Sequence, residues 1–190
     1  VKNAAKPLIN MVTLKEHYLK SVVPALQARF GYKNVMAVPR LIKVVVNVGI
    51  SSGQKDPKVI EGIRETIRLT TGQQPVERKA RKSISNFKIR KDQTVGLMVT
   101  LRGNRMYHFV EKLIKLTLPR VRDFRGLQPT SMDERGNFTL GFREAVAFPE
   151  VRAGELDRQH GLEVTIVTNA RNREEGLELL KLIGFPFKNK

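Results

Sequence analysis

The densest group of charged side chains is a cationic run over residues 78–90, which reads R-K-A-R-K-S-I-S-N-F-K-I-R. No acidic residue interrupts it. Like charges this close repel one another, so the run favours a partner with a dense array of negative charge. It lies between two predicted strands, 74–77 and 94–101, which indicates a loop held on a folded frame. Such a loop is typical of a segment that contacts nucleic acid.

The overall charge agrees with a partner made of phosphates. The chain has 190 residues, with 35 Lys and Arg against 18 Asp and Glu, and a formal net charge of +17. An anionic membrane would also attract this charge. However, the sequence shows no basic amphipathic helix with a bulky apolar face, and its apolar runs are too short to span a bilayer. Nucleic acid is therefore the better interpretation, and no membrane partner is expected.

The residues that usually carry catalysis or bind metals are absent or scattered. There are no cysteines, which excludes disulfides and thiolate sites and agrees with a reducing, cytosol-like compartment. His17, His108 and His160 have no ligand spacing, and no Asp or Glu cluster could hold Mg²⁺ or form a catalytic pair. We expect a protein that is not an enzyme, with no catalytic residue, metal, cofactor or small-molecule substrate.

A glycine-containing loop at 49–55, G-I-S-S-G-Q-K, lies where a phosphate-binding loop would lie, between a predicted strand and a predicted helix. It is one residue short between its glycines, and neither Gln54 nor Asp56 supplies the Lys or the Ser or Thr that the motif needs. Nucleotide hydrolysis is not expected. Two interpretations remain: a turn before a capped helix, or a loop whose free N–H groups touch an RNA phosphate.

Helices are predicted where apolar residues recur at helical spacing. They cover residues 13–30, 57–69, 106–118 and 172–183. The expected N-caps are Thr13, Asp56 and Asn172. Pro24 is expected to kink or divide the first helix, a turn at 102–104 to precede the third, and Pro119 to end it.

Strands are predicted at 41–49, 74–77, 94–101, 137–142 and 163–168. Strands and helices alternate without a regular βα repeat, and no linker is long enough to divide the chain. This pattern favours a single α+β domain, with an antiparallel-rich sheet and helices on one face. Residues 13–190 would form the domain, and residues 1–12 an N-terminal extension.

Alternation along the strands gives the sheet two different faces. Val44, Val46 and Val48 share one side of their strand, and Leu97, Val99 and Leu101 share one side of another. The opposite sides carry Asn47, Thr100 and Arg102. These residues either contact RNA bases and 2′-hydroxyls or belong to a solvated face. Aromatic residues make up only 6%, which favours recognition of RNA by shape, phosphate and 2′-hydroxyl over stacking of splayed bases.

Several blocks of sequence occur together in a familiar order. They are 38–49, 71–75, 78–90, 99–106, 118–126, 136–141, 148–151 and 184–188, among them V-P-R-L-I-K-V-V-V-N-V-G, T-G-Q-Q-P, L-P-R-V-R-D-F-R-G and G-F-P-F-K. Over residues 13–190 the chain resembles bacterial-type large-subunit ribosomal protein five, the 5S rRNA-binding family.

The resemblance implies a five-stranded antiparallel sheet, with helices on it and a long basic loop. It also implies that the protein lies in the central protuberance of the cytoplasmic ribosome and helps attach 5S rRNA to the large subunit and its 23S rRNA. The family's sheet-face RNA contacts fall on Asn47, Gln73 and Thr100. The basic loop, with Arg78, Lys79, Arg81, Lys82 and Ser83, matches the segment that reaches peptidyl-site tRNA and small-subunit ribosomal protein thirteen. The alternative is a free-standing RNA chaperone or ribosome assembly factor.

Overall fold

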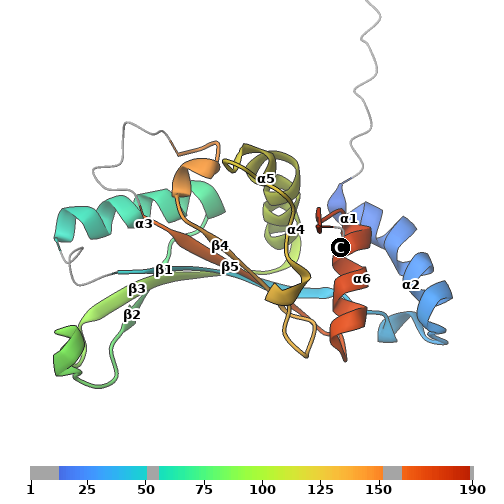
Figure 1. The fold of residues 1–190 in the computed structure, drawn as a ribbon, viewed down its shortest axis with the longest axis horizontal. Coiled ribbons are helices and arrows are strands. Elements are labelled where there is room, and N and C mark those ends of the chain that lie inside the picture. Colours follow the sequence, from blue (N-terminus) through green and yellow to red (C-terminus); the bar gives the residue numbers. More distant parts are fainter. Residues whose placement is uncertain (1–12, 51–55, 152–159, 189–190) are drawn as a thin grey trace, which may run out of the picture.

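The computed structural model describes residues 13–50, 56–151 and 160–188. Its centre is a sheet of five strands in the order β2-β3-β1-β5-β4, in which all neighbours are antiparallel (Figure 1). The strands are β1 Leu41–Gly49, β2 Val76–Lys79, β3 Thr94–Leu101, β4 Phe138–Phe142 and β5 Leu162–Thr168. The predicted α+β fold and its antiparallel five-stranded sheet are confirmed. The predicted extension 1–12 and most of the 49–55 loop lie outside the described residues.

The helices lie on one side of the sheet and at one end of it (Figure 1). Their bounds are α1 Leu14–His17, α2 Val23–Phe30, α3 Pro57–Thr71, α4 Gly103–Lys112, α5 Leu118–Arg120 and α6 Arg173–Ile183. Helices α3, α4 and α5 lie above the sheet, while α1, α2 and α6 stand beside its end. Helices therefore cover one face of the sheet, and no described element covers the other face.

The predicted division of the strands into two faces is confirmed by burial. Val44, Val46 and Val48 of β1 and Leu97, Val99 and Leu101 of β3 are buried in the core. Their neighbours on the opposite side, including Val45, Asn47 and Thr100, are only half-buried. Removal of the valine and leucine side chains from water stabilises the helix-covered face, at about 1.5–3 kcal/mol for each fully buried side chain.

The predicted N-caps are confirmed. The side chains of Thr13, Asp56 and Asn172 accept backbone N–H groups at 3.3, 3.1 and 2.9 Å. Glu175 also accepts the backbone N–H of Arg171 at 2.9 Å. These side chains satisfy N–H groups that have no partner within the helix, which fixes where each helix begins.

Pro24 and Pro119 each lie one residue beyond a π-helical turn. Tyr18–Val22 and Leu113–Thr117 are π-helical, and the N–H groups of Val23 and Leu118 donate to carbonyls five residues back. The wider turn carries the chain past a residue that has no N–H. The first helix is continuous from Leu14 to Phe30 through this turn, so the predicted division at Pro24 is wrong, and the kink predicted as its alternative stays a prediction. The prediction that Pro119 ends the third helix is wrong, because the helix continues through α5 to Arg120.

Three further predicted boundaries are corrected. The strand predicted at 74–77 runs from Val76 to Lys79, because Pro75 has no N–H to give to a ladder and the strand begins after it. Arg78 and Lys79 therefore belong to β2 and not to the loop. No separate turn precedes α4: Arg102 is its extended N-cap and the helix begins at Gly103. Helix α3 extends past the predicted Leu69 to Thr71.

Candidate nucleic-acid interface

The uncovered side of the sheet carries two adjacent rows of side chains. Register places Val76, Met98, Asn47, Glu163 and Gly141 in one row, and Thr100, Val45, Thr165 and Thr139 in the next. We call these nine residues the open sheet face. All of them are half-buried or exposed. Two of the predicted contact residues, Asn47 and Thr100, are diagonal neighbours on adjoining strands within this face.

The side chains of Asn47 and Thr100 have no hydrogen-bond partner among the described residues. Two other polar residues of the face, Thr139 and Thr165, pair with each other through hydroxyls 3.2 Å apart. The amide of Asn47 and the hydroxyl of Thr100 can each donate and accept hydrogen bonds. They are therefore available to a ligand that lies on the face.

The other two predicted rRNA contacts, Gln73 and Arg102, lie outside the strands. Gln73 is half-buried in the connection between α3 and β2, where its backbone N–H donates to the Thr71 hydroxyl at 3.3 Å. Its side chain remains unpaired within the described residues. Arg102 is exposed at the N-terminus of α4, directly after β3. The structure therefore brings Asn47 and Thr100 together but leaves Gln73 and Arg102 outside the open sheet face.

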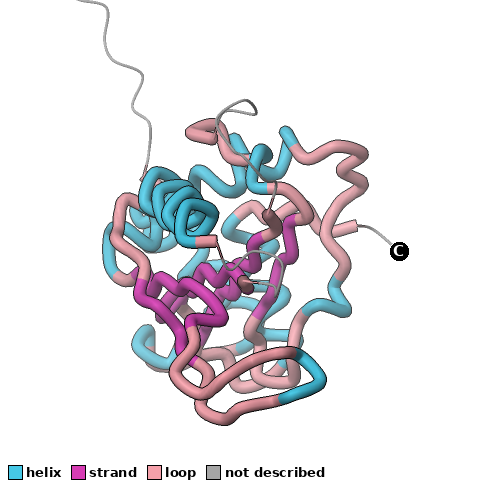
Figure 2. Tube along the Cα trace, turned by 90° about the vertical axis from the view of Figure 1, so that its left-hand side faces the viewer, coloured by secondary structure: helices cyan, strands magenta, loops and turns pink. Residues whose placement is uncertain are grey.

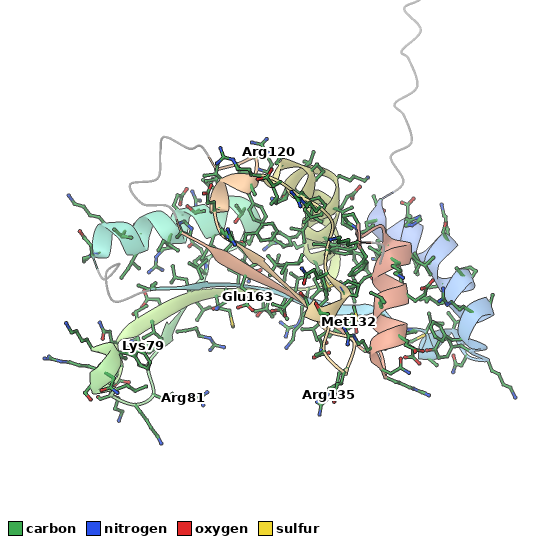
Figure 3. All side chains as sticks on the ribbon, viewed as in Figure 1. Lys79, Arg81, Arg120, Met132, Arg135 and Glu163 are labelled. Carbon is green, nitrogen blue, oxygen red and sulfur yellow. The ribbon has the colours of Figure 1, made fainter. Side chains whose placement is uncertain are left out.

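The cationic run forms a hairpin that extends from β2 and β3 beyond the body of the sheet (Figure 2). We call residues 78–93 the basic hairpin. Arg78, Lys79, Arg81, Lys82 and Ser83 are all exposed. Figure 3 shows Lys79 and Arg81 on the basic hairpin, with Arg81 on the uncovered side of the sheet. Arg78 differs from the rest because its Nη2 lies 3.5 Å from the sulfur of Met98, so its guanidinium reaches the open sheet face.

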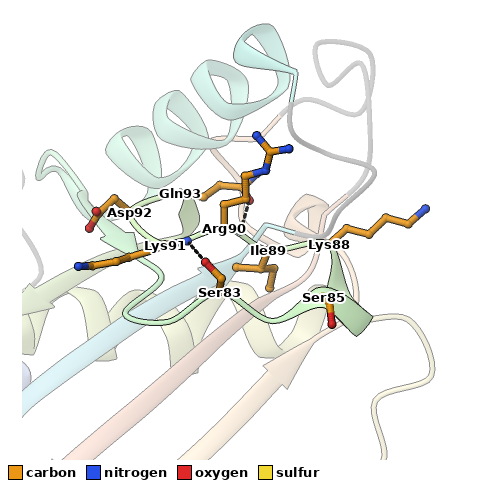
Figure 4. Close-up of a pocket in the computed structure, with 8 residues that line it drawn as sticks. All are labelled: Ser83, Ser85, Lys88, Ile89, Arg90, Lys91, Asp92 and Gln93. Atoms are coloured by element: carbon orange, nitrogen blue, oxygen red, sulfur yellow. Dashed lines mark hydrogen bonds between the residues drawn. The ribbon is translucent and has the colours of Figure 1, made fainter.

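The tip of the basic hairpin has a hydrogen-bonded framework of its own (Figure 4). Ile84 and Ile89 exchange two backbone hydrogen bonds, of 2.9 and 3.1 Å. The Ser83 hydroxyl accepts the N–H of Lys91 at 2.9 Å, and the Gln93 side chain accepts the N–H of Arg90 at 3.1 Å. Ser83, predicted as a contact residue, thus also holds the loop in shape. The cationic side chains project from an organised backbone.

Glu77 fixes the root of the basic hairpin to the helical layer. It lies on the helix-covered side of β2, where its two carboxylate oxygens accept hydrogen bonds from Arg64 of α3 at 2.6 Å and from the Thr94 hydroxyl of β3 at 3.0 Å. These hydrogen bonds, that from Arg64 above all, hold the pKa of Glu77 below its usual range. They tie both strands of the hairpin to α3.

A second basic side chain flanks the open sheet face at the opposite end. Arg135 projects to the uncovered side of the sheet from the loop before β4 (Figure 3). Asp133 holds this loop, since its carboxylate accepts the backbone N–H groups of Arg135 at 2.9 Å and Asn137 at 2.7 Å and the Asn137 amide at 2.8 Å. Burial favours the neutral acid, but these hydrogen bonds outweigh it and lower the pKa of Asp133.

Sequence reasoning missed Glu163 and Arg135 as residues of this surface. The alternation E-V-T-I-V-T was a signal that Glu163 shares a side with Thr165. The pairing of Glu163 with Asn47 depends on the register of β1 with β5, which local patterns do not determine. Among the described residues, no helix is long and apolar enough to cross a membrane, and no group of His, Asp and Glu could hold a metal ion.

These features define a basic α+β protein that offers a polar sheet face between cationic loops, an arrangement suited to RNA. Comparison with known proteins identifies the family. Residues 34–90 match the model for ribosomal protein L5, and residues 94–187 match the model for the C-terminus of the same ribosomal family. The chain belongs to this family of ribosomal proteins. It is a structural component of the ribosome and not an enzyme.

The full-length relatives agree with this assignment. The large ribosomal subunit protein uL5 of Dictyoglomus turgidum is 53% identical over 178 residues, which cover 94% of this chain and 99% of that protein. The proteins of the same name from Halothermothrix orenii and Moorella thermoacetica are 51% and 48% identical, and the matches cover 93% and 94% of this chain and 99% of each relative. The similarity therefore extends over nearly the whole of each relative.

Proposed function

We propose that this protein is a constituent of the large ribosomal subunit that binds 5S rRNA through its open sheet face. It would thereby help to attach 5S rRNA to 23S rRNA in the central protuberance. The observation that supports this role most directly is the pair of side chains on Asn47 and Thr100, which lie together on an uncovered face with no partner among the described residues. Hydrogen-bonding groups of this kind suit the 2′-hydroxyls and base edges of RNA.

The cations around the face suit the rest of an RNA ligand. Arg78 reaches over the face from β2, and Arg135 projects from the other end of the sheet. Contacts from such side chains to phosphates fix the position of RNA without selecting its sequence. We therefore expect ribose and bases to lie over the strands, near Asn47 and Thr100, and phosphates to lie at the edges, near the cations.

The basic hairpin is proposed to contact peptidyl-site tRNA and small-subunit ribosomal protein thirteen, in a bridge between the subunits. Most of its cations lie beyond the edge strand β2, so a partner held there need not lie on the sheet. Contacts to phosphate by Lys79, Arg81 and Lys82 would accept any tRNA, because they read no sequence. Lys79 lies at the end of β2, and Arg81 and Lys82 lie between this strand and the hydrogen-bonded tip.

The test of the sheet-face role replaces both Asn47 and Thr100 by Ala and measures affinity for 5S rRNA. Each lost hydrogen bond costs about 1–3 kcal/mol where an RNA group is left unpaired. We expect weaker binding with nearly unchanged thermal stability, because neither side chain contributes a hydrogen bond to the described part of the fold. Normal affinity in a folded double variant would contradict the role.

A free-standing RNA chaperone or assembly factor would use the same surface, and sedimentation separates the two functions. A ribosomal constituent should migrate with large subunits at one copy each and remain bound through washing at moderate salt. An assembly factor would be released from mature subunits by the same wash.

A further inference from the structure

We propose that Glu163 recognises an unpaired guanine of the RNA on the open sheet face. The inference rests on the proposed binding of 5S rRNA to that face, and it adds a residue that selects for base identity. The starting observation is an acidic side chain in an unexpected place. Only two acidic residues, Glu77 and Glu163, occur in the five described strands. Glu77 points to the helices, whereas Glu163 is exposed on the side offered to RNA (Figure 3).

The surroundings of Glu163 leave its carboxylate unpaired and accessible. No hydrogen bond or ion pair engages its side chain within the described residues, whereas Glu77 and Glu150 are both held by cations. Glu163 pairs with Asn47 on the adjacent strand β1 and with Gly141 on the adjacent strand β4. A Cβ added at Gly141 would meet no atom within 4 Å. There is therefore open space beside the carboxylate, over the edge strand.

The charge of Glu163 restricts which part of an RNA can lie against it. A carboxylate accepts hydrogen bonds and donates none, and it repels a phosphate at close range. On a protein with a net charge of +17, phosphates gain attraction from many other positions. The RNA groups that suit Glu163 are therefore N–H and O–H donors, which lie on bases and on 2′-hydroxyls.

Guanine is the base that matches this acceptor best. Its Watson–Crick edge presents two parallel donors, N1–H and N2–H, to the two oxygens of one carboxylate. These donors are free only where the base is unpaired, and protein recognition of RNA sequence is concentrated at such loops and bulges. Asn47, the adjacent residue of the row, offers an amide that can donate to the guanine O6 or to a ribose.

The consequence is selectivity among RNA molecules. Cations alone would hold many RNAs with similar strength, because phosphate contacts carry no sequence information. A carboxylate on the face weakens any complex that brings a phosphate there and favours one that brings a guanine edge. The repulsion of phosphate and the hydrogen bonds to guanine both increase the difference in affinity between the correct RNA and other RNAs.

The experiment compares two substitutions that change the net charge equally. Glu163→Gln alters the open sheet face, while Glu61→Gln alters an exposed residue of α3 on the helical side. The affinity of the full chain for 5S rRNA is measured for both variants and the original protein at one salt concentration. Glu163→Gln should weaken binding by roughly 5- to 100-fold, as expected for a charge-assisted hydrogen bond. Glu61→Gln should leave binding unchanged or slightly tighter.

The sign of the effect decides the inference. A carboxylate that only repels phosphates would give tighter binding when neutralised, and one that binds another protein would give no change, so either result for Glu163→Gln overturns the proposal. If the original protein fails to select 5S rRNA over an unrelated RNA, the proposed function fails as well, and that failure is visible before any variant is compared.

The RNA is then varied to identify the base. Each unpaired guanine protected by the protein is replaced by inosine, which keeps N1–H and lacks the N2 amino group. One such replacement should weaken binding to the original protein and have much less effect on the Glu163→Gln variant, because the two changes remove the same contact. If no guanine shows this dependence, the assignment to guanine is wrong.

Discussion

Arg64 of α3 donates a hydrogen bond of 2.6 Å from Nη2 to Oε1 of Glu77 on β2, and Glu77 Oε2 accepts a further one from the Thr94 hydroxyl. The single carboxylate thus joins a helix and both strands of the basic hairpin. It lies at the root of the hairpin and not at the tip. The position of the cationic side chains relative to the sheet therefore depends on a residue that is not itself cationic.

Replacing Glu77 by Ala should lower the free energy of unfolding by about 1–2 kcal/mol, because it removes the carboxylate that accepts hydrogen bonds from both Arg64 Nη2 and the Thr94 hydroxyl. Urea denaturation monitored by circular dichroism measures this. Amide exchange at Ala80 and Thr94 should also become faster if the hairpin root loosens. The matched control is Glu61→Ala, which removes the other carboxylate near Arg64 and leaves Glu77 in place. An equal loss in both variants would show that only the charge around Arg64 matters.

The loop that carries Arg135 should be sensitive to acid. The folded-state pKa of Asp133 is lowered, so the stabilisation by its carboxylate is fully present above the unfolded pKa of about 3.9. It is lost as the pH falls through the lower folded value. Asp133→Ala should therefore cost about 1 kcal/mol of unfolding free energy at neutral pH and much less near pH 2.

The control for this acid dependence is Glu134→Gln, at an exposed neighbour whose side chain makes no hydrogen bond or ion pair with the described residues. It should show no such change with pH. Urea denaturation of both variants between neutral pH and about pH 2 gives the comparison. A constant difference between Asp133→Ala and the original protein across this range would contradict the expectation.

The cations of the basic hairpin should divide into two groups. Changing Lys79, Arg81 and Lys82 together to Gln should leave 5S rRNA affinity largely intact, while mutant ribosomes retain peptidyl-site tRNA and the small subunit less well. Arg78→Gln alone should weaken 5S rRNA binding, because its guanidinium lies against Met98 on the open sheet face. Affinity measurements and tRNA retention on purified ribosomes test both halves. Loss of 5S rRNA with normal tRNA retention in the triple variant would reverse the assignment.

The affinity for 5S rRNA should fall steeply with added salt. If roughly 6–10 phosphates are contacted, as for duplex DNA, affinity should fall by on the order of a thousand-fold or more between low and near-physiological salt. Titrations at several salt concentrations give the slope of log affinity against log salt. Arg135→Gln should make this slope shallower by the amount expected for about one phosphate contact, while Lys181→Gln on α6 should not change the slope. A flat profile in the original protein would show that its net charge serves another purpose.

Much of the fold followed from local properties of the sequence. The strands β1 and β3 have the predicted bounds, because valines and leucines that alternate with other residues place one side of each strand in the core. The caps at Thr13, Asp56 and Asn172 were equally local, since each side chain bonds to an N–H two or three residues away. The outward position of Asn47 and Thr100 followed from the same alternation. These features need no knowledge of distant parts of the chain.

Other features were decided only by the tertiary structure. The strand order β2-β3-β1-β5-β4 brings Glu163 beside Asn47, although the two residues are far apart in the chain. The helix continues past Pro119 because a π-helical turn precedes this residue, which has no N–H to donate, and because Leu113 and Leu118 of that segment are buried in the core. Arg135 joined the margin of the open sheet face because Asp133 fixes its loop. Register and long-range packing depend on contacts between segments far apart in sequence, and local patterns do not encode which of those segments will meet.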